Sequence, residues 1–185
     1  MMKRFLATLL AGLALFALVG CSGKPAASAT PKDYTQILHD ARNADDNEYN
    51  MIFTKGEDGK FTAQYGYSKD YDADQLNDEI GNMMLPLLGL EEGSYTDFAA
   101  SVSAMMTQSY GIAIVKPADG KTQEVVDALN NYILSQQQTM EHYLEDQYQI
   151  AKAAKVETAP TGEVIMVCCE DSDTVLANIK AALAK

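Results

Sequence analysis

Two short apolar runs constrain the fold of this chain most strongly. Tyr110 to Val115 and Val164 to Cys169 contain only apolar or small residues, which is typical of interior strands. A helical pattern extends between them, from about Thr122 to Ala154. The order strand, helix, strand predicts a right-handed crossover that joins parallel neighbouring strands. Ile114 and Val167 are then expected side by side in the sheet centre.

Weaker patterns complete the expected fold. Phe98 to Met106 alternates apolar residues with Ser101 and Ser103, which predicts a strand with one buried face. Residues 48–67 predict a β-hairpin around a Gly-rich turn. Helices are predicted from apolar residues at helical spacing near the start of the domain, from about Asp74 to Leu88, and from Thr174 to Leu183.

These elements predict one α+β domain over residues 32–185. Its expected architecture is a mixed β-sheet with a strand-helix-strand crossover and with helices packed mainly on one face. A chain segment of this length can bury a hydrophobic core large enough for a single domain. The sequence contains no internal repeat.

The N-terminus predicts export. Lys3 and Arg4 precede an apolar run from Phe5 to Val19, which is shorter than the roughly 20 residues of a membrane-spanning helix and suits a signal peptide. The run ends in Leu-Val-Gly-Cys, which resembles a bacterial lipobox. Residues 1–20 are therefore predicted to be removed, with Cys21 as the lipidated first residue. An uncleaved signal anchor is the alternative.

Residues 21–31 are predicted to be a lipidated cysteine followed by a flexible linker. The residues after Cys21 contain no pattern of apolar side chains that could pack against a core. Removal of residues 1–20 takes two of the 14 basic residues and none of the 26 acidic ones, which leaves a formal charge of −14. Nucleic acid is excluded as a partner, since its phosphates require a basic surface. The predicted location is the outer, extracytoplasmic face of the cell membrane, held by the lipid anchor.

Cys168 and Cys169 are adjacent, and neighbouring Cα atoms lie about 3.8 Å apart, below the usual disulfide range. We expect buried free thiols; a redox pair is the alternative.

Several ordered segments carry a family resemblance, including Ser101 to Met105, Tyr110 to Ile114, Lys116 to Lys121 and Tyr143 to Lys152. In these segments the chain, from Phe98 onward, resembles domain-of-unknown-function family 4358, lipoproteins found mainly in Gram-positive anaerobes. Relatives often carry a proline at the position of Glu145, which leaves open a break of the long helix near Leu144. The resemblance implies a lipoprotein with a single domain and supplies no activity.

The catalytic patterns are incomplete. Lys116 to Thr122 follows a strand and opens a helix, but Val115 stands where a phosphate loop needs glycine, so a helix-capping turn is expected. His142 and Glu145 give only two of the three ligands of a catalytic zinc. The chain lacks the Gly-x-Ser-x-Gly motif of many hydrolases. The sequence therefore predicts no catalytic residue and no cofactor.

A weak calcium pattern precedes the second helix. Asp70, Asp72 and Asp74 have the 1-3-5 spacing of a calcium loop, but Gln75 and Gly81 replace its required glycine and glutamate. A solvated acidic helix start is the main expectation.

The long helix carries an unusual polar pattern. Gln136 and Gln147 fall on its apolar seam, where an unpaired amide costs about 1–3 kcal/mol. They are expected to bond to nearby backbone or, alternatively, to line a ligand groove with Ser101, Ser103 and Tyr148.

Taken together, these patterns predict a membrane-anchored, non-catalytic module that binds an envelope protein or a small ligand. The alternative is an enzyme or accessory subunit in envelope-polymer modification, which rests on location alone.

Overall fold

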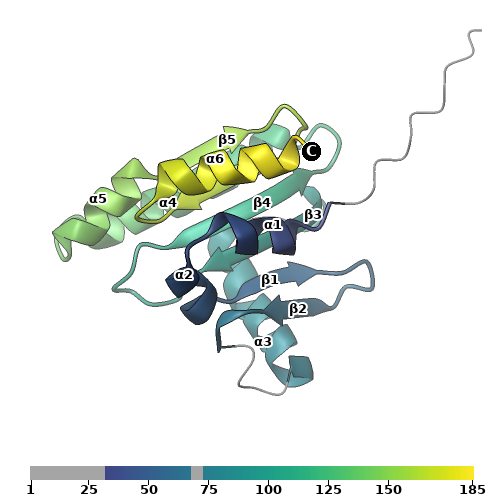
Figure 1. The fold of residues 1–185 in the computed structure, drawn as a ribbon, viewed down its shortest axis with the longest axis horizontal. Helices are drawn as coiled ribbons and strands as arrows, with labels where there is room; N and C mark the ends of the chain where they lie inside the picture. Colours follow the sequence, from purple (N-terminus) through teal and green to yellow (C-terminus); the bar gives the residue numbers. More distant parts are fainter. Residues whose placement is uncertain (1–31, 68–72) are drawn as a thin grey trace, which may run out of the picture. The chain divides into compact units, whose positions relative to one another are not determined.

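The computed structural model describes residues 32–67 and 73–185, with side chains in the second range from residue 77. Residues Lys32–Lys185 form one compact unit. Within the described residues, six strands form one sheet in the order β2-β1-β3-β4-β6-β5 (Figure 1). The strands are β1 (Ile52–Lys55), β2 (Phe61–Gln64), β3 (Tyr95–Val102), β4 (Gly111–Pro117), β5 (Lys155–Thr158) and β6 (Val164–Cys168).

Helices cover both faces of this sheet. The α-helices are α1 (Tyr34–Ala41), α2 (Ala44–Tyr49), α3 (Ala73–Met84), α4 (Thr122–Met140), α5 (Glu145–Ala153) and α6 (Ser172–Leu183), and a 3-10 helix, η2, spans Leu85–Leu88. The single α+β domain is thus confirmed. The expectation of helices mainly on one face is wrong, because α1 and α6 pack on one face and α3, η2 and α4 on the other.

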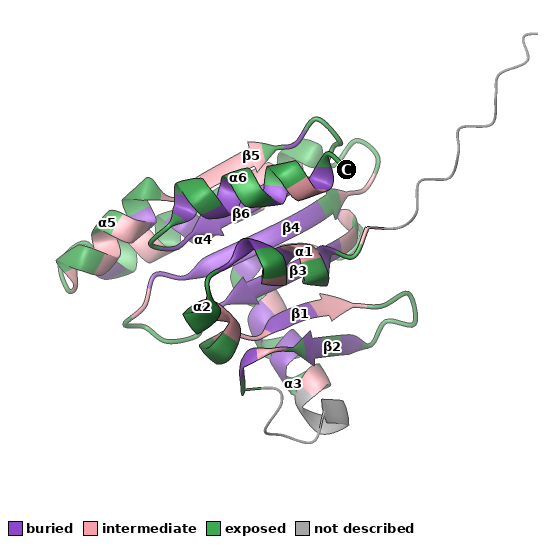
Figure 2. Ribbon diagram, viewed as in Figure 1, coloured by how far each residue is buried: buried purple, intermediate pink, exposed green. Residues whose placement is uncertain are grey.

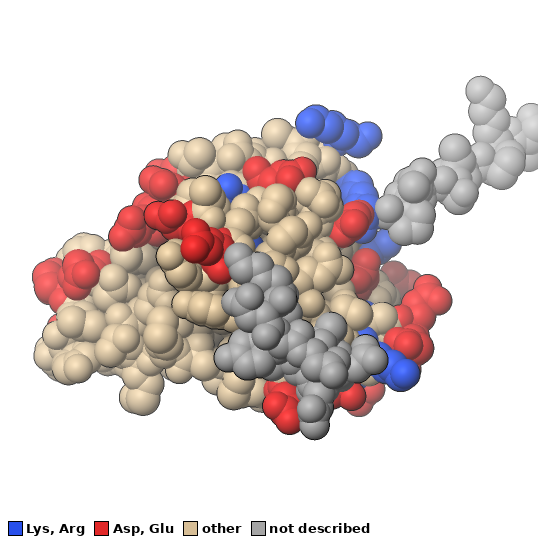
Figure 3. Space-filling model, turned by 60° about the horizontal axis from the view of Figure 1, so that its bottom comes forward, with Lys and Arg blue, Asp and Glu red and all other residues tan. Residues whose placement is uncertain are grey.

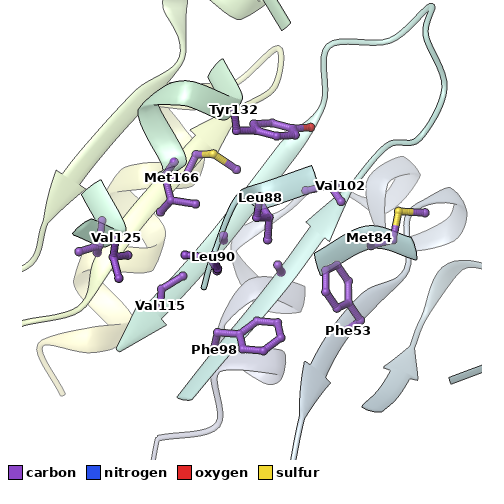
Figure 4. Packing of buried hydrophobic residues seen from close by; sticks show 14 of the residues in the cluster. Phe53, Met84, Leu88, Leu90, Phe98, Val102, Val115, Val125, Tyr132 and Met166 are labelled. Atoms are coloured by element: carbon purple, nitrogen blue, oxygen red, sulfur yellow. The ribbon is translucent and has the colours of Figure 1, made fainter. Parts of the chain in front are cut away.

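Each face of the sheet has its own hydrophobic core. Phe53, Phe98 and Met166 pack with Leu88 and Tyr132 from the helices in one core (Figure 4). The second core joins Ile112, Ile114 and Ile165 of the sheet to α1 and α6. Figure 2 shows the central strands buried along most of their length. Helices cover both faces of the sheet, so successive side chains of β4 and β6 are buried on either side. This explains why the sequences of these two strands are apolar without interruption.

The predicted parallel pairing of the two apolar strands is wrong. β4 and β6 are neighbours but run antiparallel, with Ile112 opposite Val167 and Ile114 opposite Ile165. The strand that returns after the helices is β5, and a tight turn closed by the bond from the Gly162 N–H to the Ala159 carbonyl (2.9 Å) leads from it into β6. β6 therefore lies between β4 and β5, and all pairings in the sheet are antiparallel.

β3 is buried on both faces from Phe98 to Val102, which corrects the prediction of one wet face. The strand ends at Val102, so residues 103–110 form a β3–β4 loop. The base of this loop is closed by the bond from the Ser103 N–H to the Tyr110 carbonyl at 3.1 Å. Both Met105 and Met106 are exposed.

The predicted hairpin is confirmed as β1 and β2, although its first residues form α2. The long helical segment breaks between Met140 and Glu145, which answers the question of the break near Leu144. Gln137 holds the two pieces together, since its Nε2 donates to the Ala151 carbonyl at 3.0 Å. The helix predicted to end near Leu88 ends as an α-helix at Met84, and the 3-10 helix η2 follows it. Pro86 accounts for this end, because proline cannot donate the backbone hydrogen bond of an α-helix interior.

Candidate functional site

Two hollows flank the β3–β4 loop at one end of the sheet. The first, which we call the methionine groove, has a volume of about 230 Å³ and lies between α3, η2, the loop and α4. The second, the polar cavity, has a volume of about 240 Å³ and lies between α2, the other end of the loop, α5 and the residues after β6. They share no lining residue, so each is considered separately.

The methionine groove presents flexible apolar side chains to solvent. Met105 is 62% exposed and Met106 is 77% exposed. Met83 and Leu87, at the end of α3 and in η2, are about half exposed across from them. Neutral polar groups from Ser103 and from α4 complete the lining. Since methionine adapts its shape to what it contacts, such a surface suits an apolar partner segment.

The groove lacks charge, whereas the chain as a whole is acidic. No Asp, Glu, Lys or Arg belongs to its described lining. Figure 3 shows one face of the molecule, with acidic side chains at several edges of a broad area free of charge toward the left of the view. The whole chain carries a formal charge of −12. An apolar segment with basic flanks therefore complements an uncharged groove in an acidic chain.

The polar cavity has a different chemistry. Asp45, Asp46 and Glu170 contribute carboxylates, and Gln108, Ser109 and Gln147 contribute neutral polar groups. Burial is the largest cause that raises the pKa of Asp46, and the nearby Arg42 guanidinium counteracts it. The Cys169 thiol also lines the cavity, and burial raises its pKa to about 12, so it remains a protonated thiol.

A buried arginine cluster underlies the cavity. Arg42 is 7% exposed. Its Nη1 donates to Ser101 Oγ at 2.8 Å and to the Tyr110 hydroxyl at 3.1 Å. Nε and Nη2 donate to Asn47 Oδ1 at 3.0 and 2.7 Å, and Nη2 also donates to the Asn50 carbonyl at 3.1 Å. All five N–H groups of the guanidinium are thereby matched to neutral acceptors. Arg42 thus joins the α1–α2 segment to β3 and to the end of the β3–β4 loop.

The structure separates the five predicted ligand-binding residues. Ser103 and Gln136 line the methionine groove together. Gln147 lines the polar cavity. Ser101 is fully buried against Arg42, on the opposite face of the sheet from the groove. Tyr148 lies on α5, where the Lys152 ammonium sits 5.3 Å from its ring centre. Sequence reasoning missed Arg42 and Ser109, because a lone arginine and a lone serine carry no pattern.

The two seam glutamines are expected to respond differently to mutation. Gln147 Oε1 accepts a 2.9 Å bond from the backbone N–H of Ser109, which is buried. Gln147→Leu should therefore destabilise the domain by about 1–3 kcal/mol, since that N–H loses its partner. Gln136 is half-buried in a groove open to water, and Gln136→Leu should change stability by less than about 0.5 kcal/mol. Urea unfolding of both variants measures the difference; equal losses would contradict it.

The remaining predicted sites have mixed outcomes. Asp70 and Asp72 lie outside the described residues, as does the side chain of Asp74, so the calcium pattern stays a prediction. His142 and Glu145 are divided by the helix break. In the described part of the chain, no group of three His, Cys, Asp or Glu is placed to hold a metal ion.

Cys168 and Cys169 are buried free thiols, as predicted. The segment from Lys116 to Thr122 forms a turn into α4, with the Lys121 N–H donating to the Ala118 carbonyl at 2.9 Å. Among the described residues, none of the helices has both the length and the apolar character needed to cross a membrane.

Comparison with known proteins identifies the family. A family described as Domain of unknown function (DUF4358) matches residues 67–169, which is more than half of the 185 residues. The matched region runs from the end of the hairpin through α3, β3, β4 and the long helices to the end of β6. It therefore includes the β3–β4 loop and most of the residues around both hollows. No curated protein and no solved structure matches the chain. The chain belongs to the DUF4358 family of domains.

Proposed function

We propose that this chain is a lipoprotein, anchored through Cys21 at the outer face of the cell membrane, whose domain binds a partner in the methionine groove without catalysing a reaction. The exposed methionines carry the binding proposal. The lipobox-like sequence before Cys21 and the acidic charge carry the anchor and location.

The proposed occupant of the groove is an apolar segment of an envelope protein with basic residues on its flanks. Burial of an exposed methionine or leucine side chain contributes about 1.5–3 kcal/mol, and four such side chains line the groove: Met83, Leu87, Met105 and Met106. The net negative charge of the chain attracts the basic flanks and speeds their encounter.

Methionine methyl signals test this proposal directly. Residues 32–185 contain every described element and both cores. This segment is produced with isotope-labelled methionine methyl groups, and their NMR signals are recorded. A synthetic amphipathic Leu/Lys peptide should shift the signals of Met83, Met105 and Met106, which line the groove. Met166 is fully buried in β6 and serves as the internal reference. A Leu/Glu peptide with the same apolar face should bind much more weakly, because like charges repel.

Matched variants distinguish binding in the groove from nonspecific binding of the peptide to other exposed side chains. The double variant Met105→Ser, Met106→Ser should weaken peptide binding by at least about tenfold. Tyr143→Ser is the control, since it removes a side chain that is 69% exposed and lies outside the groove. Equal effects of the two changes, or equal binding of the two peptides, would refute the groove.

The anchor has an independent test. Mass spectrometry of the protein from membranes should find an N-terminal Cys21 with two or three acyl chains, since one chain binds only marginally. Cys21→Ala should abolish this modification and block maturation at Gly20. An unmodified peptide that reads through Gly20, Cys21 and Ser22 would contradict the anchor and leave the groove test unaffected.

A further inference from the structure

The exposed methionines of the described residues gather in one place. Met83, Met105 and Met106 are each more than half exposed, and all three line the methionine groove. The other methionines in the described part of the chain are buried or partly buried: Met51, Met84, Met140 and Met166. A reagent in solution that reacts with thioethers therefore reaches the groove first.

Peroxides are the class of reagent that distinguishes methionine from the other aliphatic side chains. The thioether sulfur attacks one oxygen of the peroxide, so that an S–O bond forms and the O–O bond breaks. Sulfur loses two electrons and the peroxide gains them. With hydrogen peroxide, the second oxygen takes up the proton of the first and leaves as water. The reaction needs no further group from the protein, so access decides which methionine is oxidised.

The groups that could compete for a peroxide are protected. The sequence contains no tryptophan. Cys168 and Cys169 are buried free thiols, and burial raises the pKa of both to about 12. Because the thiolate is the form that reacts, these protonated thiols are poor targets at neutral pH. Among the described residues, mild peroxide treatment is therefore directed to the groove.

Oxidation reverses the character of the groove and leaves the fold in place. A sulfoxide is polar, and water satisfies its oxygen at an open surface. An apolar partner would displace that water and supply no donor, which makes burial of the sulfoxide unfavourable. Leu87, the fourth exposed apolar side chain of the groove, cannot react in this way. None of the three exposed methionines belongs to either hydrophobic core.

We propose that Met83, Met105 and Met106 form a peroxide-sensitive modification site, at which conversion of their thioethers to sulfoxides releases the apolar partner from the methionine groove. This regulation rests on the proposed function, because it acts on the same groove.

Peptide mapping tests the modification itself. The full chain is reconstituted in vesicles of saturated phosphatidylcholine and treated with hydrogen peroxide, and mass spectrometry after proteolysis quantifies each sulfoxide. The three groove methionines should react at least about tenfold faster than the buried ones, which become accessible only when the fold opens. The buried references are Met84, Met140 and Met166. Equal rates in the two groups would overturn the proposal.

Photocrosslinking tests the consequence for binding. A Leu/Lys peptide that carries a diazirine leucine is irradiated with the same vesicles, and its crosslinks to the groove are mapped before and after oxidation. Oxidation should lower these crosslinks by at least about tenfold, while the circular dichroism spectrum stays unchanged. The matched control is the triple variant Met83→Leu, Met105→Leu, Met106→Leu, which keeps an apolar groove of similar volume and cannot form sulfoxides. It should crosslink equally well before and after peroxide.

The outcomes separate this regulation from the groove function. Absence of groove crosslinks before oxidation would refute the groove function and the regulation with it. Crosslinks that survive oxidation of all three methionines, or that fall equally in the leucine variant, would overturn the regulation and leave the groove function standing.

Discussion

Ile114→Asp is expected to abolish the cooperative unfolding transition of the domain. Ile114 is fully buried in β4, between Ala99 of β3 and Ile165 of β6. Its side chain packs in the core under α1 and α6. A carboxylate at this position would have no partner, and burial of an unpaired charge costs several kcal/mol or more. That cost approaches the whole stability of a typical domain, about 5–15 kcal/mol.

Circular dichroism during urea titration measures this effect. Ile114→Val is the matched control, because it removes one methyl group and should cost only about 0.5–1.5 kcal/mol. A sigmoidal transition of the Asp variant near the wild-type midpoint would show that β4 does not lie in the sheet centre.

Arg42→Ala is expected to cost at least about 3 kcal/mol, because several buried neutral acceptors lose their donor and each unsatisfied group costs about 1–3 kcal/mol. The substitution would leave the Ser101 and Tyr110 hydroxyl groups and the Asn47 side chain without their donor. It would also free the α1–α2 segment from the sheet. Arg42→Lys should recover little of the loss, because an ammonium has three donors and lacks the planar fork that reaches these acceptors.

Ser101→Ala isolates one bond of this network and should cost about 1.5–3 kcal/mol, the worth of a hydrogen bond to a charged group. Urea midpoints of the three variants give the comparison. A loss below about 1 kcal/mol for Arg42→Ala would mean that the guanidinium is dispensable for the fold.

Local patterns in the sequence predicted most elements, because hydrophobic period and turn residues act over a few residues. The hairpin follows from its Gly-rich turn, and α6 buries Val175, Ile179 and Leu183 at the predicted spacing. The interior position of β4 and β6 follows from their apolar composition.

The errors arise where distant residues decide the outcome. β5 is a half-buried edge strand of four residues, too short and mixed to stand out from the preceding helix. When β5 is overlooked, the sequence predicts β6 as the strand that follows the crossover and runs parallel to β4. In the structure β6 runs antiparallel to β4. Ser101 was expected on a wet face, but Arg42, 59 positions earlier, buries it with a hydrogen bond.

The candidate sites were predicted less well than the fold. The glutamine pattern identified Gln136 and Gln147 as unusual, and they lie in two different hollows. The break of the helix at Met140 separates them, because it ends the regular spacing that placed both on one seam. An atom such as Ser109 Oγ, which has no hydrogen-bond partner among the described residues, can be recognised only once the fold is known.

The two chain ends of the domain lie together, at the pole opposite the hollows. The Lys32 ammonium donates to the Leu183 carbonyl, and Figure 1 shows the start of α1 and the C-terminus on the side where β4 ends, with the β3–β4 loop at the far side. The seven residues of β4 separate these poles by about 20 Å. The anchor proposed at Cys21 would therefore attach to the domain at the pole opposite both hollows. A reporter fused after Lys185 would stand at that same pole and leave the approach to both hollows open.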